Sequence, residues 1–171
     1  IFQYNDIKPN EYIPELYRIL KEGSHCYIMT NHVNLYEILT VAQETGFHFI
    51  KSLIWNKGNK IMGQCYMSQF EYILFFRKGK HRKINMCGTS DIIDIPNKKS
   101  KREDGTNYHD TEKPVELAEL LILNSSNEGD LVCDPFAGIG FVPIACKKLS
   151  RRFIGSEIDQ QYYNVILSRL D

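Results

Sequence analysis

The chain has 171 residues, a mass of 19.9 kDa and 43% hydrophobic residues, which is the size and composition of one globular domain. Charged residues make up 25%, which argues against disorder, and no apolar run approaches the roughly 20 residues that a membrane span needs. The five cysteines form no C-x-x-C pair, which argues against a disulfide scaffold or a zinc site and favours a reducing cytosol. We therefore predict a cytoplasmic protein without a metal.

The charges are distributed unevenly along the sequence. Lysine plus arginine and aspartate plus glutamate number 21 each, so the net charge is zero. The stretch from Arg77 to Arg102 nevertheless carries nine basic residues against Asp91 and Asp94, a net charge of +7. One basic stretch in a neutral protein predicts contact with a polyanion at one place. A solvated loop that keeps the protein soluble is the alternative interpretation.

In chain order, the first half predicts alternating helices and strands. Apolar residues recur at helical spacing over 10–20 and 33–42, and short apolar runs predict strands at 26–29, 47–55 and 72–76. Asn31 can cap the second helix and Gly46 can end it. Residues 58–69 are predicted as a loop, and the basic stretch after the third strand shows no sustained periodicity.

The second half repeats the alternation. Helices are predicted over 114–122, 142–149 and 162–170, and strands at 131–133 and 153–155. Elements that alternate at this length indicate an α/β layered fold with a mostly parallel sheet.

A glycine loop follows the strand at 131–133. It reads Asp-Pro-Phe-Ala-Gly-Ile-Gly over 134–140, and Glu157 ends the next strand. Ligands of open α/β sheets lie at such strand ends, where glycine lets the backbone approach and a carboxylate can accept bonds from ribose hydroxyls. A plain structural turn is the alternative. Pro143 stands where a dinucleotide loop wants a third glycine, and Asp134 suits a cationic amino group, so S-adenosylmethionine fits better than a dinucleotide.

Linked motifs at family spacing resemble the C-terminal half of beta-class DNA amino-methyltransferases. These motifs are LYRILKEGSHCYIMTN, LIWNKGN, EYILFFRKGK, HDTEKP over 109–114, EGD over 128–130, DPFAGIG and RRFIGSEID. Members of this family methylate the exocyclic amino group of adenine or cytosine in DNA. The resemblance implies a Rossmann-like S-adenosylmethionine-dependent methyltransferase fold, mostly parallel with an antiparallel strand, in one partial domain over 1–171.

The resemblance also implies a cofactor site. Glu157 would hold the ribose, and the loop would form the wall around the methionine part, through Asp134, Phe136, Ala137, Gly138 and Gly140. Thr111, Lys113 and Pro114 would close the other side, with Lys113 near the methionine carboxylate; an ordinary lysine at a helix start is the alternative. Asp110, Ile139 and the pair Phe141-Val142 depart from the family pattern, and the last two departures remove hydroxyls that could bind the cofactor.

The family's catalytic run, D-P-P-Y or S-P-P-Y, is absent from the sequence. In the family it ends a central strand between those predicted to end near Asn31 and at Asp134, and it positions the target amino group for in-line transfer. No catalytic residue is therefore assigned. The missing strand, together with Ile1 as the first residue, favours a truncated sequence over a natural degenerate protein, and we expect the chain alone to be inactive.

The same resemblance implies where double-stranded DNA would bind. The target base must be flipped out of the duplex, and the family places residues such as Trp55 and Lys57 near its pocket. For Trp55, core packing is the favoured interpretation. Residues 80–108 correspond to the family's target-recognition segments, whose basic side chains would contact phosphates: Arg82, Lys83, Lys98, Lys99, Lys101 and Arg102. Asn85, Ser90 and Asn107 could read bases.

Two other functions stay open at this point. One is a non-catalytic DNA- or cofactor-binding module derived from such an enzyme, and the other is a hydride-transferring Rossmann enzyme. The sequence leaves open the target base, the DNA site and the oligomeric state, with a homodimer as one option. A bacterial, archaeal or phage-encoded restriction-modification protein is the expected setting.

Overall fold

A computed structural model describes residues 7–61, 65–98, 105 and 112–171 of the chain. The chain forms two compact units, one from residues 1–83 and 88–94 and the other from residues 84–87 and 95–171. The α/β class predicted from the alternation is confirmed, and the strands pair in a mixed arrangement, some parallel and some antiparallel. The basic stretch contributes residues to both units.

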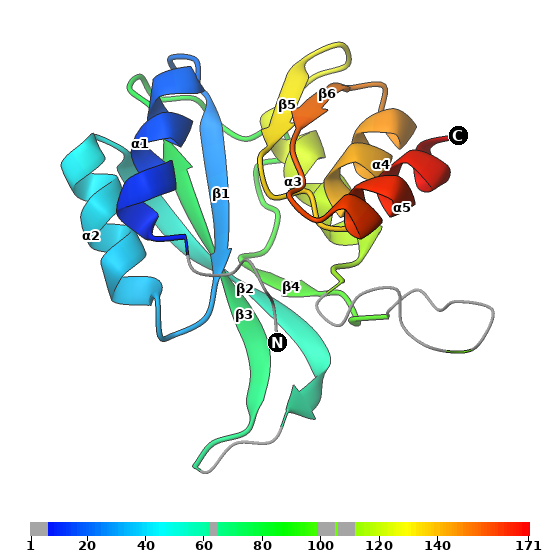
Figure 1. Cartoon of the computed structure of the whole chain (residues 1–171). Coiled ribbons are helices and arrows are strands. Elements are labelled where there is room, and N and C mark those ends of the chain that lie inside the picture. The colour runs from blue at the N-terminus through cyan, green and yellow to red at the C-terminus, as the bar shows by residue number, and fades with distance from the viewer. Residues whose placement is uncertain (1–6, 62–64, 99–104, 106–111) are drawn as a thin grey trace. The chain divides into compact units, whose positions relative to one another are not determined.

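The first unit is a four-stranded sheet with two helices (Figure 1). Its elements are α1 (Pro9–Ile19), β1 (His25–Thr30), α2 (Leu35–Thr45), β2 (His48–Ile61), β3 (Ser68–Arg77) and β4 (Ile92–Asp94). The strand order is β1-β3-β2-β4, with β3 antiparallel to both neighbours and β4 parallel to β2. The helices pack on one face through a cluster of buried side chains: Ile13, Ile28, Ile38, Ala42, Phe47, Leu74 and Phe76.

The caps of the two helices follow from local sequence. Glu11 accepts a hydrogen bond of 2.6 Å from the backbone N–H of Lys8 at the start of α1. Gly46 ends α2 with a φ of +108°, a left-handed conformation that favours glycine. The predicted start of α2 is wrong by two residues, because Asn31 accepts bonds from the N–H groups of Val33 and Asn34 and so caps the turn before the helix.

The predicted loop at 58–69 is wrong at both of its ends. β2 runs on to Ile61 and β3 begins at Ser68, so the two strands form a long antiparallel ribbon (Figure 1). The pairing shifts register between Asn56 and Ile61, and Gly58 has a φ of +79° inside this irregularity. The glycine and its polar neighbours mark a bulge in a hairpin rather than the end of a strand.

The second unit holds the glycine loop. Its elements are α3 (Val115–Ser125), β5 (Leu131–Asp134), α4 (Phe141–Lys148), β6 (Arg152–Gly155) and α5 (Gln160–Leu170). β5 and β6 are parallel, with Asp134 opposite Gly155. α3 and α4 pack on this pair through Ala118, Ile122, Ala145, Cys146, Val132 and Phe153. The side chain of Asp159 caps α5 by accepting bonds from two backbone N–H groups.

Within the described ranges, no helix is long and apolar enough to cross a membrane. The same residues contain no group of three or more histidine, cysteine, aspartate or glutamate side chains arranged to hold a metal ion.

Candidate cofactor site and nucleic-acid segment

The loop over 134–140 is held by bonds to its own backbone and to the end of β6. The N–H of Phe136 donates to Asp134 Oδ1 at 3.0 Å, and the N–H of Gly140 donates to the carbonyl of Ala137 at 2.9 Å. The N–H of Ala137 donates to the carbonyl of Ser156 at 3.0 Å. Ala137 is buried, whereas the side chain of Phe136 is 50% exposed, so its ring is open to a ligand.

Glu157 lies against this loop. Its Oε2 accepts a bond of 2.7 Å from the N–H of Gly138, and its Oε1 accepts one of 2.9 Å from the N–H of Asp159. The two carboxylates that the sequence places at neighbouring strand ends therefore lie at one edge of the β5–β6 pair. Each oxygen of Glu157 keeps a second lone pair, with which it can accept a bond from a ligand hydroxyl.

The surroundings of Asp134 act in opposite directions on the pKa of its carboxyl. Burial raises the pKa of its carboxyl, and the charge of Glu157 raises it further. The bond from the N–H of Phe136 and the charge of Lys113 act in the opposite direction on the same pKa. Two carboxylates thus lie near one lysine, an arrangement that a cationic ligand group would stabilise.

Three glycines shape the site. A Cβ placed at Gly138, whose φ is +55°, would meet no atom within 4 Å, so there is open space beside its backbone. At Gly140 a Cβ would approach Ile166 of α5 to 3.3 Å, and at Gly155 it would lie 2.3 Å from the carbonyl oxygen of Asp134. Gly155, to which the motifs gave no role of its own, permits the close approach of β6 to the start of the loop.

The predicted residues before α3 approach the same loop. Lys113 is close enough to lower the pKa of Asp134, and Pro114 is the buried N-cap residue of α3. Thr111 lies outside the described residues. The neighbouring Glu112, to which the motifs gave no role, is buried and forms an ion pair of 3.1 Å with Arg169 of α5.

The two DNA-contact residues predicted on β2 are engaged within the fold. Trp55 is 1% exposed, and Lys57 Nζ lies 5.2 Å from the centre of its ring. Lys57 also forms an ion pair of 2.8 Å with Glu71, with both side chains largely buried. Their role at a target pocket stays a prediction.

The basic stretch, residues 77–102, is held by hydrogen bonds within each of the two units. In the first, β4 pairs with β2, and Asn56 Nδ2 donates to Asp94 Oδ1 at 2.6 Å. In the second, Asn85 Nδ2 donates to the carbonyls of Leu123 and Ser126 at the end of α3. Asn85 thus serves as an anchor, and nothing in these bonds supports its reading a base.

The predicted phosphate contacts fall into two groups. Lys83 and Lys98 are exposed, and Arg82 is partly exposed while its carbonyl oxygen lies 3.1 Å from Nε2 of the buried His25. Lys99, Lys101 and Arg102 lie outside the described residues. The three described side chains are accessible to a polyanion.

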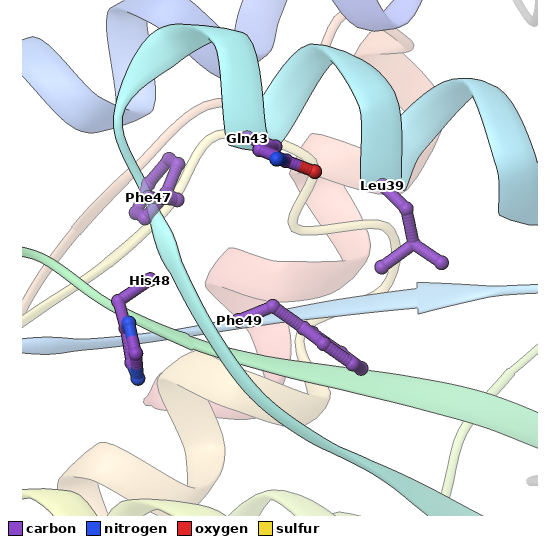
Figure 2. Close-up of a pocket in the computed structure, with 5 residues that line it drawn as sticks. All are labelled: Leu39, Gln43, Phe47, His48 and Phe49. Atoms are coloured by element: carbon purple, nitrogen blue, oxygen red, sulfur yellow. The ribbon is translucent and has the colours of Figure 1, made fainter.

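A hollow of about 350 Å³ lies elsewhere, beside α2 and the start of β2 (Figure 2). Its lining is mostly apolar: Leu39, Gln43, Phe47, His48 and Phe49. No predicted site residue of the described part lines it, so it is a feature separate from the glycine loop.

A family comparison matches nearly the whole chain. The family model for DNA methylases, named for N6 and N4 methyltransferases, matches residues 8–168. The chain belongs to the DNA methylase family. This membership confirms the resemblance to DNA amino-methyltransferases that the linked motifs indicated.

Curated relatives are longer than this chain. The type II methyltransferase M.HpaI of Haemophilus parainfluenzae is 33% identical over 187 residues, which cover 95% of this chain and 58% of M.HpaI. The type II methyltransferase M.HinfI of Haemophilus influenzae is 29% identical, covering 93% of this chain and 49% of M.HinfI. The chain therefore spans about half of the length of these relatives.

Solved structures confirm the Rossmann-like methyltransferase fold. The M1.HpyAVI–SAM complex superposes with a TM-score of 0.80 at 26% identity, covering 95% of this chain and 81% of that one. The cytosine-N4-specific PvuII DNA methyltransferase superposes with a TM-score of 0.81 at 17% identity, covering 99% and 74%, which bears on the fold alone.

Proposed function

We propose that this chain is the cofactor-binding and DNA-recognition part of an S-adenosylmethionine-dependent DNA amino-methyltransferase. The whole enzyme would methylate the exocyclic amino group of adenine or cytosine in double-stranded DNA. The observation that carries this proposal is the bond from the Gly138 N–H to Glu157, which joins the two strand ends beside Asp134. Family membership and the S-adenosylmethionine complex of M1.HpyAVI support it.

The residues at the loop fit the proposed cofactor. S-adenosylmethionine supplies a methyl group activated on a sulfonium, and it also carries an ammonium, a carboxylate and two ribose hydroxyls. Glu157 would accept bonds from the hydroxyls, Asp134 would face the ammonium, and Lys113 would meet the carboxylate. The partly buried carboxyl of Asp134, with its raised pKa, fits a cationic group, and the open space at Gly138 leaves room for the ligand.

We propose that the D/S-P-P-Y strand is supplied by sequence outside residues 1–171, and that this chain alone transfers no methyl group. Support comes from the absence of the run in the sequence and from the share of M.HinfI and M.HpaI that the chain spans. The alternative is a natural, non-catalytic module of the same origin. The prediction of a single domain over 1–171 stays a prediction.

DNA recognition is proposed for residues 80–108, with the target base flipped out of the duplex near Trp55 and Lys57. The exposed Lys83 and Lys98 and the partly exposed Arg82 support phosphate contact. A cytoplasmic location is proposed from the bacterial restriction-modification relatives, and homodimerisation stays a prediction.

The first test is isothermal calorimetry of the full chain with S-adenosylmethionine and, separately, with NADH. We expect binding of S-adenosylmethionine alone; binding of NADH alone would overturn the proposal in favour of hydride chemistry. The second test supplies an upstream polypeptide that contains D/S-P-P-Y and follows radiolabelled methyl transfer to duplex DNA. Transfer supports the enzyme, whereas salt-sensitive DNA binding without transfer supports the non-catalytic module.

A further inference from the structure

The last helix reaches the glycine loop through one guanidinium nitrogen. Nη1 of Arg169 donates to Glu112 Oε1 at 3.1 Å and to the carbonyl oxygen of Ile139 at 2.9 Å. Glu112 precedes Lys113, and Ile139 lies between Gly138 and Gly140. A single side chain therefore binds both segments that border the proposed cofactor site.

We propose that Arg169 is a positioning residue for the amino-acid end of the bound cofactor. This inference rests on the proposed function, because it assigns a role within the S-adenosylmethionine site. Arg169 would act through Glu112 and Ile139, fixing the distance between Lys113 on one segment and Asp134 on the other. It would itself make no contact with the ligand.

The ion pair between Arg169 and Glu112 is largely buried. The side chain of Glu112 is 4% exposed and that of Arg169 is 25% exposed. Loss of a charged partner destabilises a buried carboxylate, so removing the guanidinium should loosen residues 112–113. Such a loosening would change the distance from Lys113 to Asp134, the carboxyl whose pKa the charge of Lys113 lowers.

A second contact from α5 keeps the loop in place. Ile166, one turn before Arg169, lies where a Cβ on Gly140 would approach it to 3.3 Å. Residues three apart share a helix face, so α5 supports the loop sterically at Gly140 and by hydrogen bonding at Ile139. Removing the guanidinium leaves the steric support intact, which favours a folded variant with a loosened site.

The test compares two ligands on the full chain. S-adenosylmethionine carries the amino-acid end, whereas 5′-methylthioadenosine keeps the nucleoside and lacks that end. In Arg169→Gln we expect the Kd for S-adenosylmethionine to rise about tenfold, the size of one missing charge-assisted interaction, and the Kd for 5′-methylthioadenosine to change less than about twofold. Calorimetry measures both at a temperature where circular dichroism shows the variant folded.

Matched variants separate positioning from stability. Lys148→Gln removes an exposed ion pair of 2.9 Å with Glu119 in the same unit and should leave both Kd values unchanged. Arg169→Lys keeps the charge and several donors on one nitrogen, but its side chain is one atom shorter than the path to Nη1, so we expect an intermediate Kd. Glu112→Gln should weaken S-adenosylmethionine binding too, and the double variant with Arg169→Gln should add little to either single change.

The outcomes distinguish this inference from the proposed function. If the unaltered chain binds S-adenosylmethionine and Arg169→Gln binds it equally well, the positioning role is wrong while the site stands. An equal weakening for both ligands would reduce Arg169 to a structural residue and overturn the inference. If the unaltered chain binds neither ligand, the proposed site itself is overturned. Amide hydrogen exchange at Ile139 and Gly140, faster in Arg169→Gln without any ligand, reports the loosened loop independently.

Discussion

Asp134 and Glu157 are both acidic and lie at the same strand ends, yet they have different surroundings. Glu157 accepts two backbone N–H bonds, from Gly138 and Asp159, and is satisfied by the fold itself. Asp134 accepts one such bond, and burial outweighs it, so the pKa of Asp134 is raised. Glu157 therefore organises the loop, whereas Asp134 holds a charge that the fold alone does not stabilise.

This difference predicts that Asp134 lowers the stability of the fold and strengthens the binding of the cofactor. Its raised folded pKa means that the fold loses stability as the pH rises from the unfolded pKa through the folded one, and the decrease is complete above the folded pKa. Asp134→Asn should remove this decrease and raise Tm at pH 7, by about 2–4 °C for each kcal/mol regained. A calorimetric scan at pH 7 measures this change.

The same substitution should weaken S-adenosylmethionine binding by about tenfold or more, because a hydrogen bond to a charged group contributes about 1.5–3 kcal/mol. Titration calorimetry measures it. A variant that is more stable and binds as tightly as the unaltered chain would disprove an ammonium contact at Asp134.

For Glu157 we expect the opposite effect, because this side chain stabilises the fold. Glu157→Ala should lower Tm, because the N–H groups of Gly138 and Asp159 lose their acceptor, and it should weaken S-adenosylmethionine binding by about 1–3 kcal/mol. Glu157→Gln is the matched control, since its amide oxygen can still accept one of these bonds. An unchanged Kd in the alanine variant would retire the ribose assignment.

At the scale of elements, the parallel pair β5–β6 depends on one small residue. A side chain at Gly155 would collide with the carbonyl of Asp134, which lies 2.3 Å from the Cβ position. The carbonyl oxygen belongs to the backbone and a Cβ is bonded directly to it, so rotation of a side chain cannot separate the two atoms. The strand ends, and with them the loop, require glycine here.

Gly155→Ala should therefore destabilise the chain by about 1–3 kcal/mol, the usual cost of overpacking, and should weaken cofactor binding in the same variant. Urea unfolding gives the first quantity and calorimetry the second. Ile154→Ala, at a neighbouring side chain that is 56% exposed, should change stability by about 0.5 kcal/mol or less. Equal effects of the two substitutions would contradict the steric argument.

The sequence predicted the strongly patterned elements and missed those set by pairing. Helices with an apolar stripe, such as α3, were found because their signal is local. β4 was missed, since three residues are too few to show a period and only pairing with β2 makes them a strand. The end of β2 was missed for a related reason, because Gly58 is a turn signal that the ribbon absorbs as a bulge.

The site divides in the same way. The meeting of Glu157 with the glycine loop was predictable, because consecutive parallel strands bring their carboxyl ends to one edge. Arg169 was not predictable, since it binds Glu112 from 57 positions along the chain and no local pattern announces the pair. The burial of Trp55 agrees with the core packing that the sequence offered for this residue.

At the scale of the whole molecule, a neutral chain carries one concentrated positive charge. Zero net charge gives no general attraction to a polyanion, so any DNA binding must be local to the stretch with a net charge of +7. Binding of this kind releases counterions from the DNA and weakens with salt.

We therefore expect the affinity for duplex DNA to fall as the salt concentration rises. In the double variant Lys83→Gln and Lys98→Gln, the slope of log affinity against log salt concentration should decrease by about 0.9 for each phosphate that the protein no longer neutralises. Fluorescence anisotropy measures the slope at salt concentrations of roughly 50 to 200 mM, where this electrostatic effect is large. Lys21→Gln, at an exposed lysine outside the stretch, is the control and should leave the slope unchanged. Equal slopes for all three proteins would identify the stretch as a solubilising one.

The two anchors of the basic stretch have a consequence for how the protein could change its DNA preference. Asn56 donates to Asp94, and Asn85 donates to the carbonyls of Leu123 and Ser126. Neither anchor uses the side chain of Lys83 or Lys98, which are exposed. These exposed positions can therefore vary, and a new preference for DNA can evolve there, without loss of the bonds that hold the stretch.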